Sequence, residues 1–148
     1  MISVRPFQAK DIQSIDPRSD KVMVDHVNWA SFEDDPNVKI FTLLKGTEPV
    51  MVFGATLMNS ALPHYEAFAV VDKDASNYPF RVVRTLIRVL QATSNSFQRL
   101  QITVDSEDST AQKFAKLLGF EGEGYLRCNG PNGEDHILYS RIGRVWIR

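Results

Sequence analysis

Residues 108–127 read DSTAQKFAKLLGFEGEGYLR, and this stretch decides the fold. Its helical part follows two polar residues, Asp108 and Ser109, either of which can cap the first turn of a helix. Gly119 comes at the end of the helical pattern, where glycine commonly terminates a helix because it adopts a left-handed backbone at little cost. Segment 124–127 then has the composition of a strand. The stretch therefore predicts a capped helix, a glycine stop and a strand.

The segments around this stretch continue the alternation of strands and helices. Val- and Ile-rich runs predict strands at 99–104 and His136–Ile142, the latter following the turn 129–133 (NGPNG). Pro79 suits the first turn of a helix, because its missing N–H is not needed there. Residues 66–71 form a short apolar run, as in a strand covered on both faces. This order indicates parallel pairing in the second half of the chain.

The first half of the chain predicts an antiparallel arrangement. Residues 1–6 alternate apolar and polar side chains, which is typical of a strand. Residues 18–33 carry apolar side chains at helical spacing and predict an amphipathic helix. The apolar runs Val38–Lys45 and 49–58 are separated by Gly-Thr-Glu, which predicts a hairpin. Gly54 in the second run indicates a bulge or a close approach of another group to the backbone.

Together these elements predict an α/β (α+β) fold in one domain, residues 1–148. The expected architecture is a mixed, mostly antiparallel central sheet that is flanked by helices on both faces. A length of 148 residues and a hydrophobic content of 43% fit a single soluble domain. Residues 10–15 are expected to form a short helix. The basic and aromatic tail, residues 143–148, is expected to form a short extra strand or a contact arm.

Composition excludes several classes of protein. The formal net charge of −1 gives no overall basic field, so a nucleic-acid partner is not favoured. The single cysteine, Cys128, cannot form an intramolecular disulfide, and the three histidines lack the spacing of metal ligands, so no metal site is expected. Residues 1–6 lack a signal-peptide layout, and no apolar run approaches the roughly 18 residues of a membrane span. A cytoplasmic protein without membrane contact is expected.

Residues 108–127 resemble a motif of the GNAT superfamily of N-acetyltransferases. In that family a helix often begins with Asn-x-x-Ala/Ser, ends in Leu-Gly-Phe and is followed by Glu-Gly and an aromatic strand. Asp108 stands where Asn is usual, Ala111 matches the small residue, and residues 118–120 are Leu-Gly-Phe. Residues 2–6 (ISVRP) also look like the family's first strand, and the predicted order of elements is the family's order. Within the family the chain looks most similar to small acetyltransferase-like proteins of tailed bacteriophages.

The resemblance implies that acetyl-CoA is the co-substrate. In the family its pantetheine arm runs along the fourth strand, here residues 66–71, and pairs with main-chain groups, one of which polarises the thioester carbonyl. Its pyrophosphate lies at the N-terminus of the next helix, where free N–H groups favour an anion. The cofactor-binding residues that this implies are Ala69, Val70, Val71, Lys73, Arg81, Arg84, Asp108 and Ala111.

Two parts of the chain depart from the family's pattern. The loop after the fourth strand usually has glycines that let the backbone close on the phosphates, whereas residues 72–81 (DKDASNYPFR) contain none. Asp72 and Asp74 in this loop oppose an anion, and a solvated loop without a ligand is the alternative. The usual general acid, a tyrosine three residues before the leucine of Leu-Gly-Phe, is replaced by Ala115.

The resemblance also suggests catalytic residues. Glu66 has the position of a general base on the fourth strand, and His64 lies close to it in the sequence. Tyr125 is a stand-in for the missing acid, with Tyr139 and Cys128 as other candidates, and a structural role is open for each.

Two functions follow from the resemblance. The first is acetyl-CoA-dependent N-acetyl transfer to an amine of a protein or a small molecule. The alternative is a catalytically reduced binding protein, either a phage virion component or an effector that captures a host protein, acting in the host cytoplasm or the virion. A homodimer is compatible with both.

Overall fold

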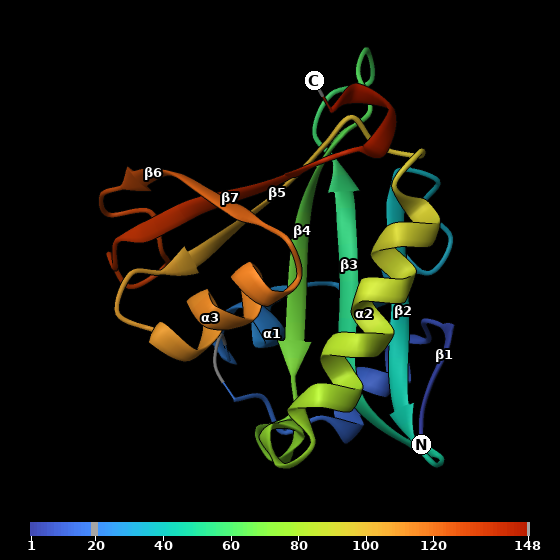
Figure 1. Cartoon of the computed structure of the whole chain (residues 1–148). Coiled ribbons are helices and arrows are strands. Elements are labelled where there is room, and N and C mark those ends of the chain that lie inside the picture. The colour runs from blue at the N-terminus through green and yellow to red at the C-terminus, as the bar shows by residue number, and fades with distance from the viewer. Residues whose placement is uncertain (19–20, 148) are drawn as a thin grey trace. The chain divides into compact units, whose positions relative to one another are not determined.

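The computed structural model describes residues 1–18 and 21–147 as an α+β fold with a seven-stranded sheet. The strands follow the order β1-β2-β3-β4-β5-β7-β6 (Figure 1). The pair β4–β5 is parallel, whereas β1–β2, β2–β3, β5–β7 and β6–β7 are antiparallel. The sheet is therefore mixed and mostly antiparallel, as the sequence predicts. None of the described helices is long and apolar enough to cross a bilayer.

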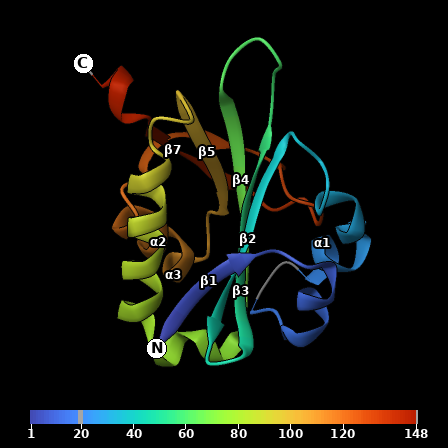
Figure 2. The same cartoon turned by 90° about the vertical axis from the view of Figure 1, so that its right-hand side faces the viewer.

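The contacts of the chain cluster into two compact units, and the first comprises Met1–Thr56 and Ala67–Thr85. Its strands β1 (Ile2–Pro6), β2 (Val38–Lys45) and β3 (Glu48–Leu57) form an antiparallel meander, which confirms the predicted hairpin. Figure 2 shows these three strands between α1 on one side and the beginning of α2 on the other.

The core of the first unit is aromatic. The ring of Trp29, 8% exposed, packs against Phe7, Phe32 and Phe68, with ring centroids 5.6 to 6.1 Å apart. Gly54 lies beneath this cluster, because a Cβ at that position would sit 2.6 Å from Cζ of Phe68. The predicted close approach at Gly54 is confirmed. The register shift between β2 and β3 falls elsewhere, between residues 43 and 44.

Of the two helices predicted before β2, the first is present and the second is broken into two short pieces. Residues 10–15 were expected to be helical, and Ala9–Ser14 form a 3-10 helix there. The prediction of a single helix over residues 18–33 is wrong. α1 (Lys21–His26) is followed by a separate 3-10 turn at Trp29–Phe32, so that the indole of Trp29 reaches the core and donates to a main-chain carbonyl of α1 at 2.9 Å. Packing of this one large ring overrides the helical spacing.

The second unit comprises Leu57–Glu66 and Leu86–Arg148. It contains three complete strands and the start of β4 (His64–Val71): β5 (Arg99–Asp105), β6 (Glu121–Leu126) and β7 (His136–Ile142). The start of β4 pairs in parallel with β5, which confirms the predicted parallel pairing. β6 begins three residues earlier than segment 124–127 suggested.

Helix α3 (Ser109–Leu117) follows β5 and packs on it. The carboxylate of Asp108 caps it by accepting the N–H of Ala111 at 3.1 Å. Gly119 ends it with a φ of 89°, a left-handed conformation that suits glycine. Both signals that residues 108–127 carried for a capped and glycine-terminated helix are confirmed.

Helix α2 (Pro79–Thr93) begins at the predicted proline. At its other end it meets the tail, residues 143–148. Among the described residues of the tail, Arg144–Trp146 form a 3-10 turn, so the predicted extra strand is wrong. The N–H of Arg144 donates to the carbonyl of Ser94 at 3.2 Å, which holds the turn against the end of α2.

Candidate cofactor site

The edge of β4 that faces away from β3 is the first part of the site. Asp72 N–H donates to the carbonyl of Val50 in β3 at 2.9 Å, whereas Lys73 N–H donates on the other edge, to the carbonyl of Asp16. The N–H and C=O groups of successive strand residues point to alternate edges. The main-chain N–H and C=O groups of even-numbered residues of β4 therefore point toward β3, and those of odd-numbered residues point to the outer edge. Ala69 and Val71 consequently present their main-chain groups on the outer edge.

The start of β4 shows the same alternation. The carbonyl of His64 accepts from Met58 at 2.9 Å, whereas the carbonyl of Pro63 accepts on the other edge from Gln98 at 2.8 Å. By the same parity the main chain of Val70 faces β3, and its side chain is only 2% exposed in the core. Val70 therefore does not fit the role in cofactor binding that the resemblance implied for it.

The end of the outer edge is covered by another segment of the chain. Residues 16–18 lie antiparallel to it, with a bridge between Pro17 and Asp72. Arg18 N–H donates to the carbonyl of Val71 at 2.8 Å, and Lys73 N–H donates to the carbonyl of residue 16 at 2.9 Å. Among the described residues, no pairing covers the N–H and C=O of Ala69 or the N–H of Val71 on this edge. Sequence reasoning missed this pairing, because residues some 55 positions apart gave no local signal of it.

The loop after β4 has regular structure, but Lys73, Asp74 and Asn77 in it are exposed, so the alternative of a solvated loop without a ligand stays open. Lys73–Asn77 form a 3-10 helix that Asp72 caps, and the carboxylate of Asp72 accepts N–H groups from Asp74 at 3.0 Å and Asp16 at 2.9 Å. The N–H groups of residues 72–75 are all bonded within the protein. They are thus not available to a phosphate group. The side chain of Ser76 lies outside the described residues.

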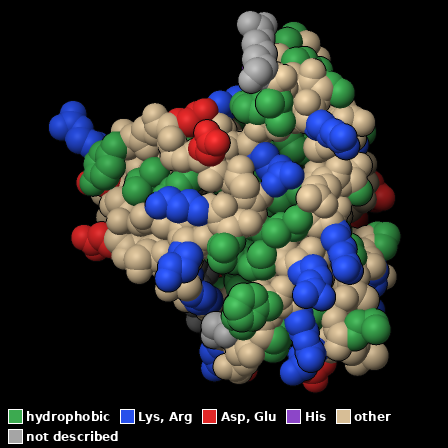
Figure 3. All heavy atoms as spheres, in the orientation of Figure 1, with side chains coloured by type: hydrophobic (Ala, Val, Ile, Leu, Met, Phe, Trp, Pro, Cys, Tyr) green, Lys and Arg blue, Asp and Glu red, His purple; other side chains and the backbone are tan. Residues whose placement is uncertain are grey.

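The N-terminus of α2 follows directly. Its first recorded main-chain bond runs from Val82 N–H to the carbonyl of Tyr78 at 3.4 Å. In the part of the chain that the structure describes, the N–H groups of Phe80 and Arg81 have no acceptor, as expected for the first turn of a helix. Lys and Arg side chains gather over α2 in Figure 3. Arg81 and Arg84 are both exposed, and neither forms an ion pair with another described residue.

The charges around the loop are mixed. Lys73 Nζ lies 2.9 Å from Asp16 Oδ2, and this carboxylate raises the pKa of Lys73, so its charge is already balanced. Burial raises the pKa of Tyr78, and the nearby carboxylates of Asp72 and Asp74 raise it further. Lys45 Nζ of β2 lies 4.6 Å from the centroid of the Tyr78 ring and adds one positive charge beside these carboxylates. Arg81 and Arg84 add exposed positive charges on α2.

The candidate catalytic residues lie in the second unit. Glu66 is exposed on β4. Tyr125 is 58% exposed, and its hydroxyl donates to Asp135 Oδ2 at 2.8 Å. The carboxylate of Asp135 also accepts the N–H of Cys128, and these two bonds hold the pKa of Asp135 below its usual value. Tyr125 thus braces its own hairpin, and no recorded bond among the described residues joins it to Glu66.

Other candidates have structural partners. His64 Nε2 lies 3.1 Å from the side-chain oxygen of Gln98, and Tyr139 is 2% exposed. Ala115, at the position of the family's acid, is buried in α3. The described residues contain no group of three or more His, Cys, Asp or Glu that could hold a metal ion.

No family model and no curated protein matches the chain. Solved structures match nearly all of it. A GNAT-family acetyltransferase from Streptococcus pneumoniae matches with a TM-score of 0.72 and 16% identity, over 96% of this chain and 99% of its own. The ribosomal-protein-S5-alanine acetyltransferase from Vibrio fischeri gives 0.68 and 16%, over 99% and 96%. The microcin C7 self-immunity acetyltransferase, solved with acetyl-CoA and AMP, gives 0.72 and 16%, over 95% and 92%.

The chain has the GNAT acetyltransferase fold. The identities are low, so the likeness extends to the path of the backbone and not to individual side chains. The GNAT fold is retained here although the loop after β4 has no glycine and α3 has Ala115 in place of a tyrosine. Residues 16–18 and the cap at Asp72 define the shape of that loop instead.

Proposed function

We propose that the chain is an acetyl-CoA-dependent N-acetyltransferase that acts on an amine of a protein or a small molecule. One observation carries this proposal. The outer edge of β4 at Ala69 leads, within one unit, to an α2 N-terminus where the N–H groups of Phe80 and Arg81 have no acceptor among the described residues. An open strand edge suits the amide groups of a pantetheine arm, and a helix start suits a pyrophosphate.

Main-chain groups of β4 would hold the arm of the cofactor. Acetyl-CoA, when bound, supplies an acetyl group activated as a thioester. The N–H groups of Ala69 and Val71 would donate on the outer edge of the strand, one of them to the thioester carbonyl. Such a fixed donor stabilises the negative charge that develops on a carbonyl oxygen under attack.

Two side chains would transfer protons during the reaction, one as general base and one as general acid. Glu66 is exposed and lies three positions before Ala69 on β4, so we assign it the role of general base, accepting a proton from the attacking amine through water. Ala115 has no proton to give. We assign Tyr125 the protonation of the leaving thiolate, at the expense of its bond to Asp135, with the exposed thiol of Cys128 as the other candidate.

The pyrophosphate would depend on α2 more than on the loop. The carboxylates of Asp72 and Asp74 oppose an anion, and Lys73 is balanced by Asp16. Arg81, in the first turn of α2, and Arg84, one turn further, would supply the positive charge. Asp108 and Ala111 are already joined in the cap of α3, so we propose no direct bond from them to the cofactor.

Calorimetric titration with acetyl-CoA tests this proposal. Replacement of Arg81 by alanine should raise the Kd roughly tenfold, the usual effect of losing a hydrogen bond to a charged group. Arg88→Ala is the matched control, because Arg88 is equally exposed on the same helix but lies about two turns from its start. Absence of binding at millimolar acetyl-CoA would contradict the proposal. Equal effects of the two replacements would contradict the role of Arg81.

A binding protein on the same fold is the second candidate, and specific observations favour it. The N–H groups of residues 72–75 are already bonded, Lys73 is paired, and Ala115 replaces the usual acid. Such a protein would be a phage virion component or an effector that captures a host protein. It would form a stoichiometric complex without cofactor and would release no thiol from acetyl-CoA with any amine, and both results can be measured on the same preparation.

A further inference from the structure

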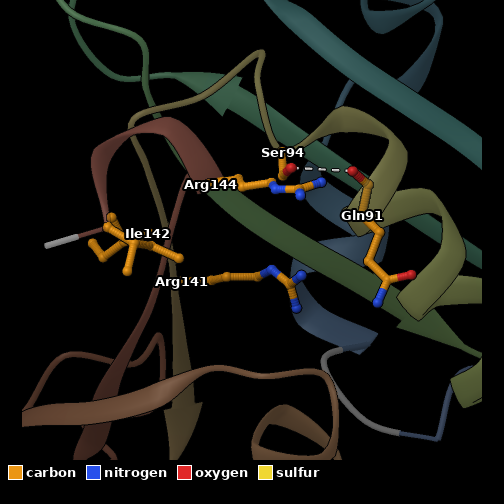
Figure 4. Close-up of a pocket in the computed structure, with 6 residues that line it drawn as sticks. Gln91, Ser94, Arg141, Ile142 and Arg144 are labelled. Atoms are coloured by element: carbon orange, nitrogen blue, oxygen red, sulfur yellow. Dashed lines mark hydrogen bonds between the residues drawn. The ribbon is translucent and has the colours of Figure 1, made fainter.

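The second unit contains a hollow of about 450 Å³ between the end of α2, the end of β7 and the tail. This volume falls within the range of small-molecule sites, roughly 300 to 1,000 Å³. The hollow combines two guanidinium groups, an amide, a hydroxyl and two aliphatic side chains, and no carboxylate of a described residue lines it. Figure 4 shows its lining residues, which are Gln91, Ser94, Arg141, Ile142, Arg144 and Ile147.

Arg141 is the deeper of the two cations. It is half-buried on β7, and burial lowers its pKa. Its Nη1 donates to the carbonyl of Leu118 at the end of α3, and Gly119 leaves space for it, since a Cβ there would lie 2.6 Å from Nη1. Among the described residues Arg141 forms no ion pair. One N–H of this guanidinium is therefore bonded to a neutral carbonyl. Its other N–H groups have no acceptor among the described residues and can bond to a ligand.

Arg144 brings a second positive charge to the same hollow. Its main-chain N–H is anchored to the carbonyl of Ser94, so the position of this residue is set independently of its side chain. In Figure 4 the guanidinium groups of Arg141 and Arg144 both extend toward α2, where the side chain of Gln91 faces them. Two like charges at one hollow repel each other, and a bound anion would relieve that repulsion.

We propose that this hollow binds an oxyanion, a carboxylate or phosphate group, on a small molecule whose apolar part contacts Ile142 and Ile147. The planar fork of arginine matches both anions and forms charge-assisted hydrogen bonds with them. The amide of Gln91 adds a neutral donor. None of the lining residues is among those assigned above to acetyl-CoA, so this site would exist whether or not the protein is an acetyltransferase.

A residue-resolved NMR titration with inorganic phosphate, at constant ionic strength, tests this site. Saturable shifts are expected at the side-chain N–H groups of Gln91 and Arg141 and at the main-chain N–H of Arg144. Arg144→Ala keeps the main-chain anchor of the tail and should weaken the binding roughly tenfold. Arg127→Ala, which removes an exposed arginine of the same unit, should leave it unchanged.

A parallel titration with acetate separates the two anions, and saturation by either supports the site. The proposal would be overturned if neither anion produced a saturable shift, or if the shifts were confined to Phe80 and Arg81. It would also be overturned if Arg144→Ala had no greater effect than Arg127→Ala. Confinement to Phe80 and Arg81 would instead point to the proposed cofactor site.

Discussion

Replacing Asp11 by asparagine tests the contact that ties the first strand to the rest of its unit. The carboxylate of Asp11 is 1% exposed and accepts four hydrogen bonds. Two come from the guanidinium of Arg5 at 2.7 and 2.8 Å, one from the N–H of Gln8 at 2.9 Å, and one from the hydroxyl of Thr42 at 2.7 Å. Asparagine has nearly the same shape but no charge, and it offers its own N–H groups to these donors.

The expected loss of stability follows from burial. Breaking a buried ion pair by removing one partner costs about 3 to 5 kcal/mol. The side chain of Arg5 is 30% exposed and can regain water, which places the expected loss near the lower limit, about 3 kcal/mol. For a chain of 148 residues, each kcal/mol lowers Tm by roughly 2 to 4 °C, so a decrease of about 6 to 12 °C is expected.

The stabilisation by Asp11 should decrease at low pH. Burial raises the pKa of Asp11, but the hydrogen bonds from Arg5, Thr42 and Gln8 outweigh it and hold that pKa below the ordinary value of 3.8. The stabilisation is therefore complete above the unfolded-state pKa and is lost as the pH falls through the lowered pKa. The difference in unfolding free energy between the native protein and Asp11→Asn should shrink at pH values below 3.8.

Urea unfolding followed by circular dichroism measures both effects. Asp16→Asn is the control, because Asp16 pairs with Lys73 at the surface, where an ion pair contributes about 0.2 to 1 kcal/mol. A loss for Asp11→Asn no larger than that of the control would refute the reasoning. So would a difference that stays constant as the pH is lowered.

Three further variants test other features. Gly143→Ala should destabilise the protein by about 2 kcal/mol or more in urea unfolding, because a Cβ would lie 1.8 Å from the main-chain oxygen of Phe97; unchanged stability would mean that the tail is not packed there. Cys128→Gly should raise the unfolding free energy by roughly 0.5 kcal/mol, because Cys128 has a φ of 53° that suits glycine; a marked loss would contradict this. Glu66→Gln should slow thiol release from acetyl-CoA roughly 100-fold while the calorimetric Kd stays the same, and a parallel loss of affinity would argue against a role as base.

The fold could be predicted well where short-range signals act alone. Pro79 begins α2, Asp108 caps α3, and Gly119 ends it, because each depends on a backbone preference of one residue. The helix over residues 18–33 failed for the opposite reason. Apolar spacing indicates a helix but not where it breaks, and the break follows from the need to bury Trp29.

The candidate site could be predicted only in part. The sequence and its resemblance to a family placed the expected cofactor contacts on β4 and at the start of α2, but they could not tell alternate strand residues apart. Val70 was included, whereas the parity of the hydrogen bonds turns its main chain toward β3. The hollow at Arg141 was missed altogether, since it gathers residues from α2, β7 and the tail that no motif connects.

The pairing of residues 16–18 with the end of β4 has a consequence for protein engineering. The conformation of residues 72–78 depends partly on residues 16–18. These form main-chain bonds at Arg18 and Lys73, and the N–H of Asp16 donates to the carboxylate of Asp72. Residues 72–78 grafted alone into another protein with the GNAT fold would not keep this conformation. A transplant that includes residues 16–18 would be the smallest portable unit, and a one-residue deletion before α1 should disturb the loop as much as a change within it.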